Sequence, residues 1–364
     1  MELPWKKYYD GTDASSEEEK LMKEYGTFLY KKYLFIIICT IGAIVVAGFA
    51  TTIGPYQIGF FESFKIIFEH IFGNIQDSTK DYVIWDVRLP RIVAGIVAGA
   101  GLAIAGATMQ STMKNPLADP YTTGISAGAA FGATLSIVLG LSIINGNFTI
   151  ILNAFVFSLI PMGVILLIST VKQASPTVII LSGLAVMYLF NAMTTVMMLM
   201  ANPNALAEAF TWQIGTLGMA KWSSIPIMFI VTLIGGIALQ LLSGKINVLM
   251  SGDESARSLG INADKLRIIG LLIVSLMAAT IVSFTGIIGF VGLVCPHICR
   301  MFVGSDNKFL LPSSAAFGAV FLIVADLVGR TIISPTILQV GVITAFIGGP
   351  VLLYLLIRQK KEAW

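Results

Sequence analysis

Long stretches without charged residues recur along this chain from Tyr33 to its end at Trp364. A helix that crosses the hydrocarbon core of a bilayer needs about 20 predominantly apolar residues, and about ten stretches meet that requirement. Charged residues make up 12% of the sequence, against about 25% in soluble domains. The sequence therefore predicts an all-α membrane protein, a polytopic bundle of about ten transmembrane helices. The predicted spans are 33–54, 90–113, 121–141, 148–170, 177–200, 224–243, 265–284, 287–303, 309–329 and 339–357.

Basic residues are distributed unevenly between the two sides of these spans. If the N-terminus is cytoplasmic, most of the 23 Lys and Arg residues fall on the cytoplasmic side, as the positive-inside rule requires. We therefore expect both termini in the cytoplasm. Residues 1–32 are expected to be a polar cytoplasmic extension, forming a surface helix, with 33–358 as the transmembrane domain and 359–364 as a cytoplasmic tail. The net charge of +3 is spread along cytoplasmic edges, so no nucleic-acid partner is expected.

Three cysteines lie within apolar runs, at Cys39, Cys295 and Cys299. His297 stands between the last two, and this Cys-Pro-His-Ile-Cys segment allows two interpretations. It could be part of a metal site, but a metal site needs further ligands, and the sequence offers no second cluster of them. Buried thiols in helices also behave as small apolar groups. We favour the second interpretation and predict that this chain binds no metal.

Two predicted spans carry small residues every four positions. Gly95, Gly99 and Ala103 form one such series, and Gly124, Gly128 and Gly132 lie in the next span. Small residues allow the backbones of neighbouring helices to approach closely in lipid. The pattern predicts tight packing of both segments.

Arginines gather at the predicted outer ends of two spans. Pro90 suits the first turn of a helix, and it places Arg88 and Arg91 at the positive end of that helix dipole, where an anion is favoured. That anion could be a lipid phosphate, a local carboxylate such as Asp86, or acidic residues of an external partner. Asp326 and Arg330 are four residues apart and are predicted to pair on one helix face.

Two segments between spans have strong local signals. In Lys114–Pro120 each proline excludes helical geometry from the residue before it, which predicts a stiff, ordered turn on the cytoplasmic side. In the loop at about 244–264, Ser251 and Glu254 have the spacing of a capping box, and Gly260 can end a helix. This loop predicts a short amphipathic helix outside the membrane, with Ala256 and Leu259 toward a contact surface that could receive a motor subunit.

Six motifs occur in a characteristic order: RLPR, GAGLAIAGATMQ, NPLADP, GDESARSLG, GFVGLVCPHICR and VGVITAFIGGPVLLYLL. Together they resemble the FecCD-type permease subunits of iron-siderophore, haem and cobalamin ATP-binding-cassette (ABC) importers, the cobalamin permeases in particular, over residues 34–358. The resemblance implies a type II ABC importer permease in a prokaryotic cell membrane. It implies a homodimer served by two ATPase subunits and an extracytoplasmic substrate-binding protein. It also implies alternating access driven by ATP, with ATP and Mg on the partner ATPase and no cofactor on this chain.

The resemblance also assigns roles to residues. Arg88, Arg91 and Arg330 look like the docking sites for carboxylates of the binding protein. The cytoplasmic gate would contain Asn115 and Leu117, with the turn at Ser175 and Thr177 as a second candidate. The helix that couples to the ATPase would contain Ser251, Gly252, Asp253, Glu254, Ala256, Arg257, Leu259 and Gly260. Ile337 and Gln339 stand where the family usually has an acidic residue and a proline, which leaves the organisation of the outer mouth open.

Other functions fit the sequence less well. The chain has no G-x-x-x-x-G-K-[ST] phosphate loop, so it is expected to be a transport subunit and not an enzyme, with hydrolysis by another polypeptide. A transporter coupled to protons or sodium ions would place ionisable residues deep within spans, and these spans are nearly free of charge. A permease of the same family for a small oxyanion such as molybdate remains an alternative.

Overall fold

The computed structural model describes residues 16–144, 146, 148–172 and 174–358, and within these ranges it contains helices and no β-strand. Among the described residues, seven helical segments are long and apolar enough to cross a membrane, and three shorter helices are also apolar: α5 (Ile125–Leu139), α12 (Val291–Val303) and α14 (Val340–Arg358). Each predicted span overlaps one helix, which confirms the ten-helix bundle. These helices are α1 (Ser16–Ala50), α4 (Leu89–Met113), α5 (Ile125–Leu139), α6 (Thr149–Val171), α7 (Pro176–Leu199), α9 (Ile225–Met250), α11 (Ala263–Thr285), α12 (Val291–Val303), α13 (Asn307–Thr331) and α14 (Val340–Arg358).

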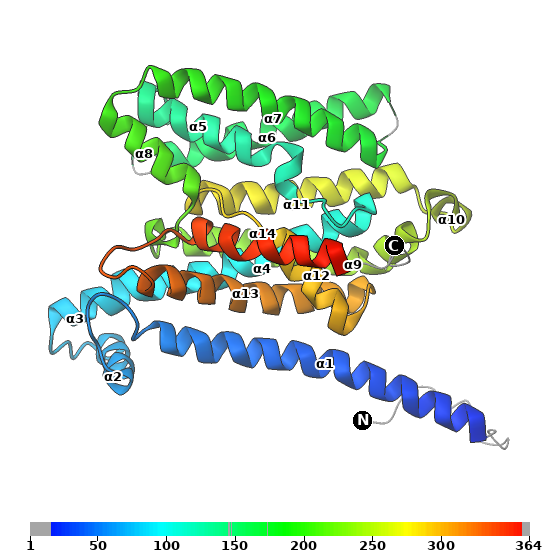
Figure 1. The fold of residues 1–364 in the computed structure, drawn as a ribbon, viewed down its shortest axis with the longest axis horizontal. Helices are drawn as coiled ribbons and strands as arrows, with labels where there is room; N and C mark the ends of the chain where they lie inside the picture. Colours follow the sequence, from blue (N-terminus) through cyan, green and yellow to red (C-terminus); the bar gives the residue numbers. More distant parts are fainter. Residues whose placement is uncertain (1–15, 145, 147, 173, 359–364) are drawn as a thin grey trace.

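The helices lie side by side, and the two ends of the bundle differ (Figure 1). The start of α1, the end of α14 and the short helix α10 (Asp253–Ser258) lie at one end. The opposite end carries α2 (Phe60–Ile71) and α3 (Ser78–Tyr82). We call these the α10 end and the α2 end. The two described chain ends share one side of the bundle, as an even number of crossings requires.

Helix α4 is buried along most of its length and packs against α13, α9, α11 and α12. Glycines allow α4 to pack this closely against its neighbours. A Cβ atom added at Gly99 would lie 2.3 Å from the carbonyl oxygen of Gly318, and one at Gly106 would lie 1.9 Å from that of Gly292. Cβ atoms at Gly128 or Gly132 in α5 would lie 2.4 Å from carbonyl oxygens of α6. The predicted tight packing of both segments is confirmed, because no side chain fits at these crossings.

The first helix differs from expectation. Residues 16–32 are not a separate surface helix, since α1 runs without a break from Ser16 to Ala50. Residues 1–15 of the predicted extension, and the predicted tail at 359–364, lie outside the described residues.

The start of α4 follows the sequence prediction, with Pro90 in its first turn. A π-helical segment, η2 (Val83–Arg88), precedes it. The remaining short elements are the 3-10 helices η3 (Pro120–Thr123) and η4 (Leu217–Met219), and helix α8 (Pro203–Ile214).

Candidate functional site

Arginines from two helices share one buried carboxylate near the α2 end. Arg91 Nε of α4 donates to both carboxylate oxygens of Asp326 in α13, at 2.8 and 3.0 Å. Arg330 Nε lies 3.0 Å from Asp326 Oδ2, which confirms the predicted pairing four residues apart. The carboxylate is buried with 2% of Asp326 exposed. This arrangement joins α4 to α13 through charge.

Arg88 completes this arginine cluster by binding backbone carbonyls. Its guanidinium donates to the carbonyl oxygens of Thr51, at 2.5 Å, and Tyr56. Arg330 likewise donates to the carbonyl oxygen of Ile53 at 2.8 Å. Asp86, one candidate for the local carboxylate, is exposed. The local carboxylate that pairs with Arg91 is instead Asp326, because the packing of α13 against α4 brings it to Arg91.

A polar recess of about 510 Å³ opens beside the arginine cluster. Arg330 lines it directly, and a Cβ atom added at Gly54 in its wall would lie 3.1 Å from a terminal nitrogen of Arg88. The structure therefore brings the three predicted docking arginines together, but below the surface and with Arg91 held by Asp326. The recess is lined by Thr52, Ile53, Gly54, Gln57, Ile58, Gly59, Arg330, Thr331 and Ser334.

The turn after α4 is ordered, as predicted, and folds back into the bundle. Asn115 Oδ1 accepts from the backbone N–H of Leu117 at 2.9 Å, an Asx turn that fixes the chain direction. Asp119 is buried and caps η3 through the N–H of Tyr121. The Tyr121 hydroxyl donates to the carbonyl oxygen of Ile288 at 3.0 Å. Leu117 is left 42% exposed.

The second predicted gate segment lies where α6 meets α7. Ser175 is the N-cap of α7 and accepts from the N–H of Val178 at 3.3 Å, while Thr177 is exposed. Ala174 of this turn and Ala118 of the turn after α4 belong to one buried apolar cluster. Both candidate gate segments therefore border the same buried apolar cluster.

The predicted cytoplasmic helix exists as α10, but its capping differs from the prediction. Ser251 ends α9 instead of capping α10, and Gly252 with φ 129° turns the chain between the two helices. The capping box with Glu254 is therefore wrong, because α9 extends to Met250 and leaves no extended residue at Ser251. Gly260 has φ 75°, as its predicted role requires.

The two apolar residues predicted to form the contact face of this helix, Ala256 and Leu259, have different surroundings. Ala256 is fully buried against Leu249, Ala263 and Leu266. Leu259 is 68% exposed, because it lies past the last helical residue, Ser258. The prediction that both face one contact surface is wrong. The exposed residues of α10 are Glu254, Ser255, Arg257 and Ser258, and Leu259 directly after the helix is exposed as well.

Asp253 makes two contacts that were not predicted from the sequence. Its Oδ1 atom lies 2.9 Å from Lys114 Nζ and 2.5 Å from a terminal nitrogen of Arg267. The hydrogen bond from Arg267, with Lys114 acting in the same direction, lowers the pKa of Asp253 to about 2. One signal was available: a cation near the start of a predicted span, such as Arg267, needs a nearby counter-ion.

The cysteines are free and buried, and His297 lies between Cys295 and Cys299 on α12. Within the described ranges, no group of three or more His, Cys, Asp or Glu side chains is placed to hold a metal ion.

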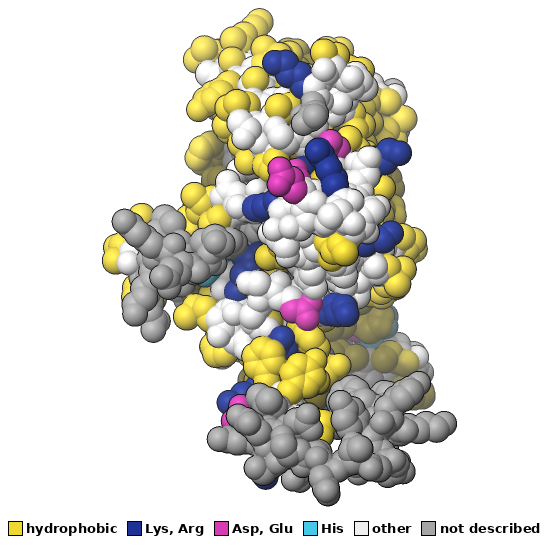
Figure 2. Space-filling model, turned by 90° about the vertical axis from the view of Figure 1, so that its right-hand side faces the viewer, with side chains coloured by type: hydrophobic (Ala, Val, Ile, Leu, Met, Phe, Trp, Pro, Cys, Tyr) yellow, Lys and Arg dark blue, Asp and Glu magenta, His cyan; other side chains and the backbone are white. Residues whose placement is uncertain are grey.

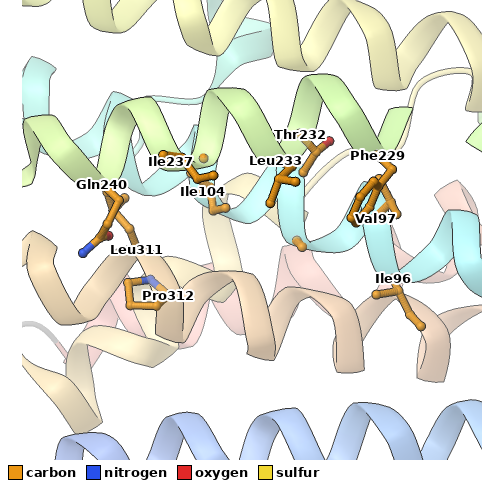
Figure 3. Close-up of a pocket in the computed structure, with 12 residues that line it drawn as sticks. Ile96, Val97, Ile104, Phe229, Thr232, Leu233, Ile237, Gln240, Leu311 and Pro312 are labelled. Atoms are coloured by element: carbon orange, nitrogen blue, oxygen red, sulfur yellow. The ribbon is translucent and has the colours of Figure 1, made fainter. Parts of the chain in front are cut away.

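An apolar cavity of about 460 Å³ lies between α4, α9 and α13 (Figure 3). Thr232 and Gln240 are the polar side chains of its lining, and the rest comprises residues such as Ile96, Phe229 and Ile237. This lining suits hydrocarbon and offers no charged group to a polar substrate.

Comparisons with known proteins agree with this arrangement. An ABC transporter permease protein of Methanocaldococcus jannaschii is 40% identical, over 93% of this chain and 99% of that protein. The hemin transport system permease protein of Yersinia pestis is 35% identical, over 78% of this chain and 87% of that protein.

A solved structure shows the same fold. It is described as an inward-facing conformation of a metal-chelate type ABC transporter. The two chains superpose with a TM-score of 0.78 and are 27% identical, and the alignment covers 89% of this chain and 99% of the solved chain. The profile of the FecCD transport family matches residues 38–358. The chain is therefore a multi-pass membrane permease and not an enzyme, and it belongs to the FecCD transport family.

Proposed function

We propose that this chain is the membrane permease of an ABC importer for chelates of the iron-siderophore, haem or cobalamin kind. Family membership supports the importer class. The hemin permease relative and the metal-chelate type structure support the substrate class. A small oxyanion remains the alternative cargo.

Helix α10 is the observation on which this proposal rests. It stands outside the spans between α9 and α11, anchored by buried Ala256, with Glu254, Arg257 and Leu259 exposed. A rigidly held helix with a free polar face suits reception of a separate ATPase subunit, which would carry the ATP and Mg. Two such subunits would serve a homodimer of this chain.

The α10 end is the cytoplasmic side in this proposal. Figure 2 views that end and shows Lys and Arg side chains spread over it, and most of the 23 Lys and Arg residues fall in the segments on this side of the predicted spans. This bias supports the positive-inside orientation, with both termini in the cytoplasm. The α2 end, with the arginine cluster, would then face the extracytoplasmic binding protein.

Docking would use the polar recess. A carboxylate of the binding protein could enter it and meet Arg330 in the lining and Arg88 behind the wall. Charge-assisted pairs of this kind are strong and directional. Arg91 would act mainly by holding Asp326.

Substrate would pass between two copies of the chain by alternating access. Large side chains such as Tyr188, Leu199 and Phe346 are exposed on α7 and α14 and could contact lipid or a second copy. Asn115 and Leu117, with Ser175 and Thr177 nearby, would form the cytoplasmic gate.

The test is uptake of labelled ferric siderophore, haem and cobalamin into proteoliposomes that contain the chain, its ATPase and its binding protein. Ser334→Glu places a negative charge at the recess and leaves the three arginines intact. We expect ATP-dependent uptake of one chelate, strongly reduced by Ser334→Glu and unchanged by Asn74→Glu, an exposed control at the same end. Uptake driven by an ion gradient without ATPase would refute the importer class, and ATP-driven uptake of molybdate alone would refute the chelate class.

A further inference from the structure

One carboxylate joins α10 to the helix that precedes the candidate gate. Asp253, the first residue of α10, lies 2.9 Å from Lys114 Nζ. Lys114 is the residue that ends α4, and Asn115 follows it directly. A contact between residues 139 positions apart therefore connects the two segments that the proposed function assigns to coupling and gating.

The same carboxylate oxygen is held by a second cation that cannot easily move. The Arg267 side chain is 1% exposed. Its Nε donates to the carbonyl oxygen of Thr112 at 3.2 Å, and another nitrogen lies 3.6 Å from Asp264. Arg267 thus fixes α10 to the start of α11 and to the last turn of α4.

Lys114 differs from Arg267 in two ways. Its side chain is partly exposed, with 34% accessible, and its backbone conformation is unusual. It has φ 50° and ψ 38°, a left-handed conformation that is uncommon for residues other than glycine. This conformation ends α4 and sets the direction in which the chain leaves. A force on the Lys114 side chain would therefore act on the backbone where the turn begins.

The turn and the last part of α4 reach a second helix. Gln110 Nε2 donates to the carbonyl oxygens of Gly292 and Leu293, both at 3.2 Å, and Gln110 Oε1 accepts from Arg300 at 2.6 Å. A Cβ atom added at Gly292 would lie 3.1 Å from Asp119 Oδ2. Movement at Lys114 would thus displace α12 as well as the turn.

We propose that Asp253, Lys114 and Arg267 form a relay that transmits displacement of α10 to the turn at 115–119 and to α12. Asp253 is a positioning residue in this relay, Arg267 its fixed anchor and Lys114 its link to the gate. The inference rests on the proposed function, because it assigns the contact that couples the ATPase to the gate.

The experiment measures chelate uptake and ATP hydrolysis in the same proteoliposomes, together with the amount of ATPase retained by the permease. Lys114→Met and Asp253→Asn remove the link, Lys114→Arg keeps its charge, and Lys308→Met removes an exposed lysine from the same end. We expect both link variants to lower uptake per ATP hydrolysed by about fivefold or more, the lower range of coupling between sites. Lys114→Arg and Lys308→Met should leave that ratio unchanged.

Three outcomes overturn the relay. The first is that Lys114→Met leaves uptake per ATP hydrolysed unchanged. The second is that Lys308→Met lowers this ratio as much as Lys114→Met does. The third is that Lys114→Met retains so little ATPase that the lost ATPase by itself accounts for the lower ratio. Lys114 lies outside α10, so its variant tests the relay even if Asp253→Asn disturbs that helix. Absence of ATP-driven uptake by the unaltered chain would instead refute the proposed function, which keeps the two failures distinct.

Discussion

Arg91 and Asp326, 235 positions apart in the sequence, form a two-pronged ion pair between α4 and α13. Asp326 also pairs with Arg330, so one buried carboxylate neutralises charge from two helices. Breaking a buried pair leaves an uncompensated charge in a poorly solvated place. This relationship gives Asp326 a structural role at the α2 end.

Asp326→Asn should destabilise the protein strongly. Removing the carboxylate leaves two buried guanidinium groups without their counter-ion, a loss of about 3–5 kcal/mol for a buried pair. Denaturant unfolding in detergent micelles measures it, with the exposed Asp86→Asn as control, expected within about 0.5 kcal/mol of the unaltered chain. A small effect of Asp326→Asn would show that water reaches the cluster.

Gly106→Ala should prevent close packing of α4 against α12. The added methyl carbon would lie 1.9 Å from the carbonyl oxygen of Gly292, and backbone there cannot move aside without separating the helices. Gly163→Ala in α6 is the control, because no atom lies within 4 Å of its added carbon, and it should stabilise by about 0.5–1 kcal/mol. Thermal unfolding in detergent distinguishes the two, and equal stability of both variants would contradict the close approach.

The stabilising effect of Asp253 should be constant near neutral pH. Arg267 and Lys114 hold the pKa of Asp253 at about 2, below the usual 3.8. A lowered carboxyl pKa contributes stability that is fully present above 3.8 and is lost as pH falls toward 2. The difference in Tm between the unaltered chain and Asp253→Asn should therefore stay level from pH 7 to 5 and shrink below about 3.8. A difference that already shrinks between pH 7 and 5 would argue against these ion pairs.

Leu117→Cys should cross-link two copies of the chain if Leu117 lies at a gate between them. Leu117 is exposed at the turn after α4, whereas the native cysteines are buried. A short bis-maleimide reagent should give a dimer on denaturing gels and block uptake, while Lys308→Cys, on α13, should stay monomeric. Cross-linking of both variants, or of neither, would count against this placement of the gate.

The number of membrane-spanning helices, their apolar character and two series of close backbone approaches could be predicted from the sequence alone. These properties are local, since the length of an apolar run and the spacing of glycines act within one helix. The stiff turn at Asn115 and the pairing of Asp326 with Arg330 were also predictable, because both depend on residues only a few positions apart.

Which charges meet and which side chains remain exposed depends on how the helices pack, and this could not be read from the sequence. Asp326, the partner of Arg91, and Lys114, one of the two partners of Asp253, lie far away in the sequence, so no local pattern could select Asp326 over Asp86, or Lys114 over any other cation. The capping box at Ser251 failed for the same reason. Local spacing allowed it, but the extension of α9 to Met250 and the ion pairs of Asp253 fixed the start of α10 elsewhere.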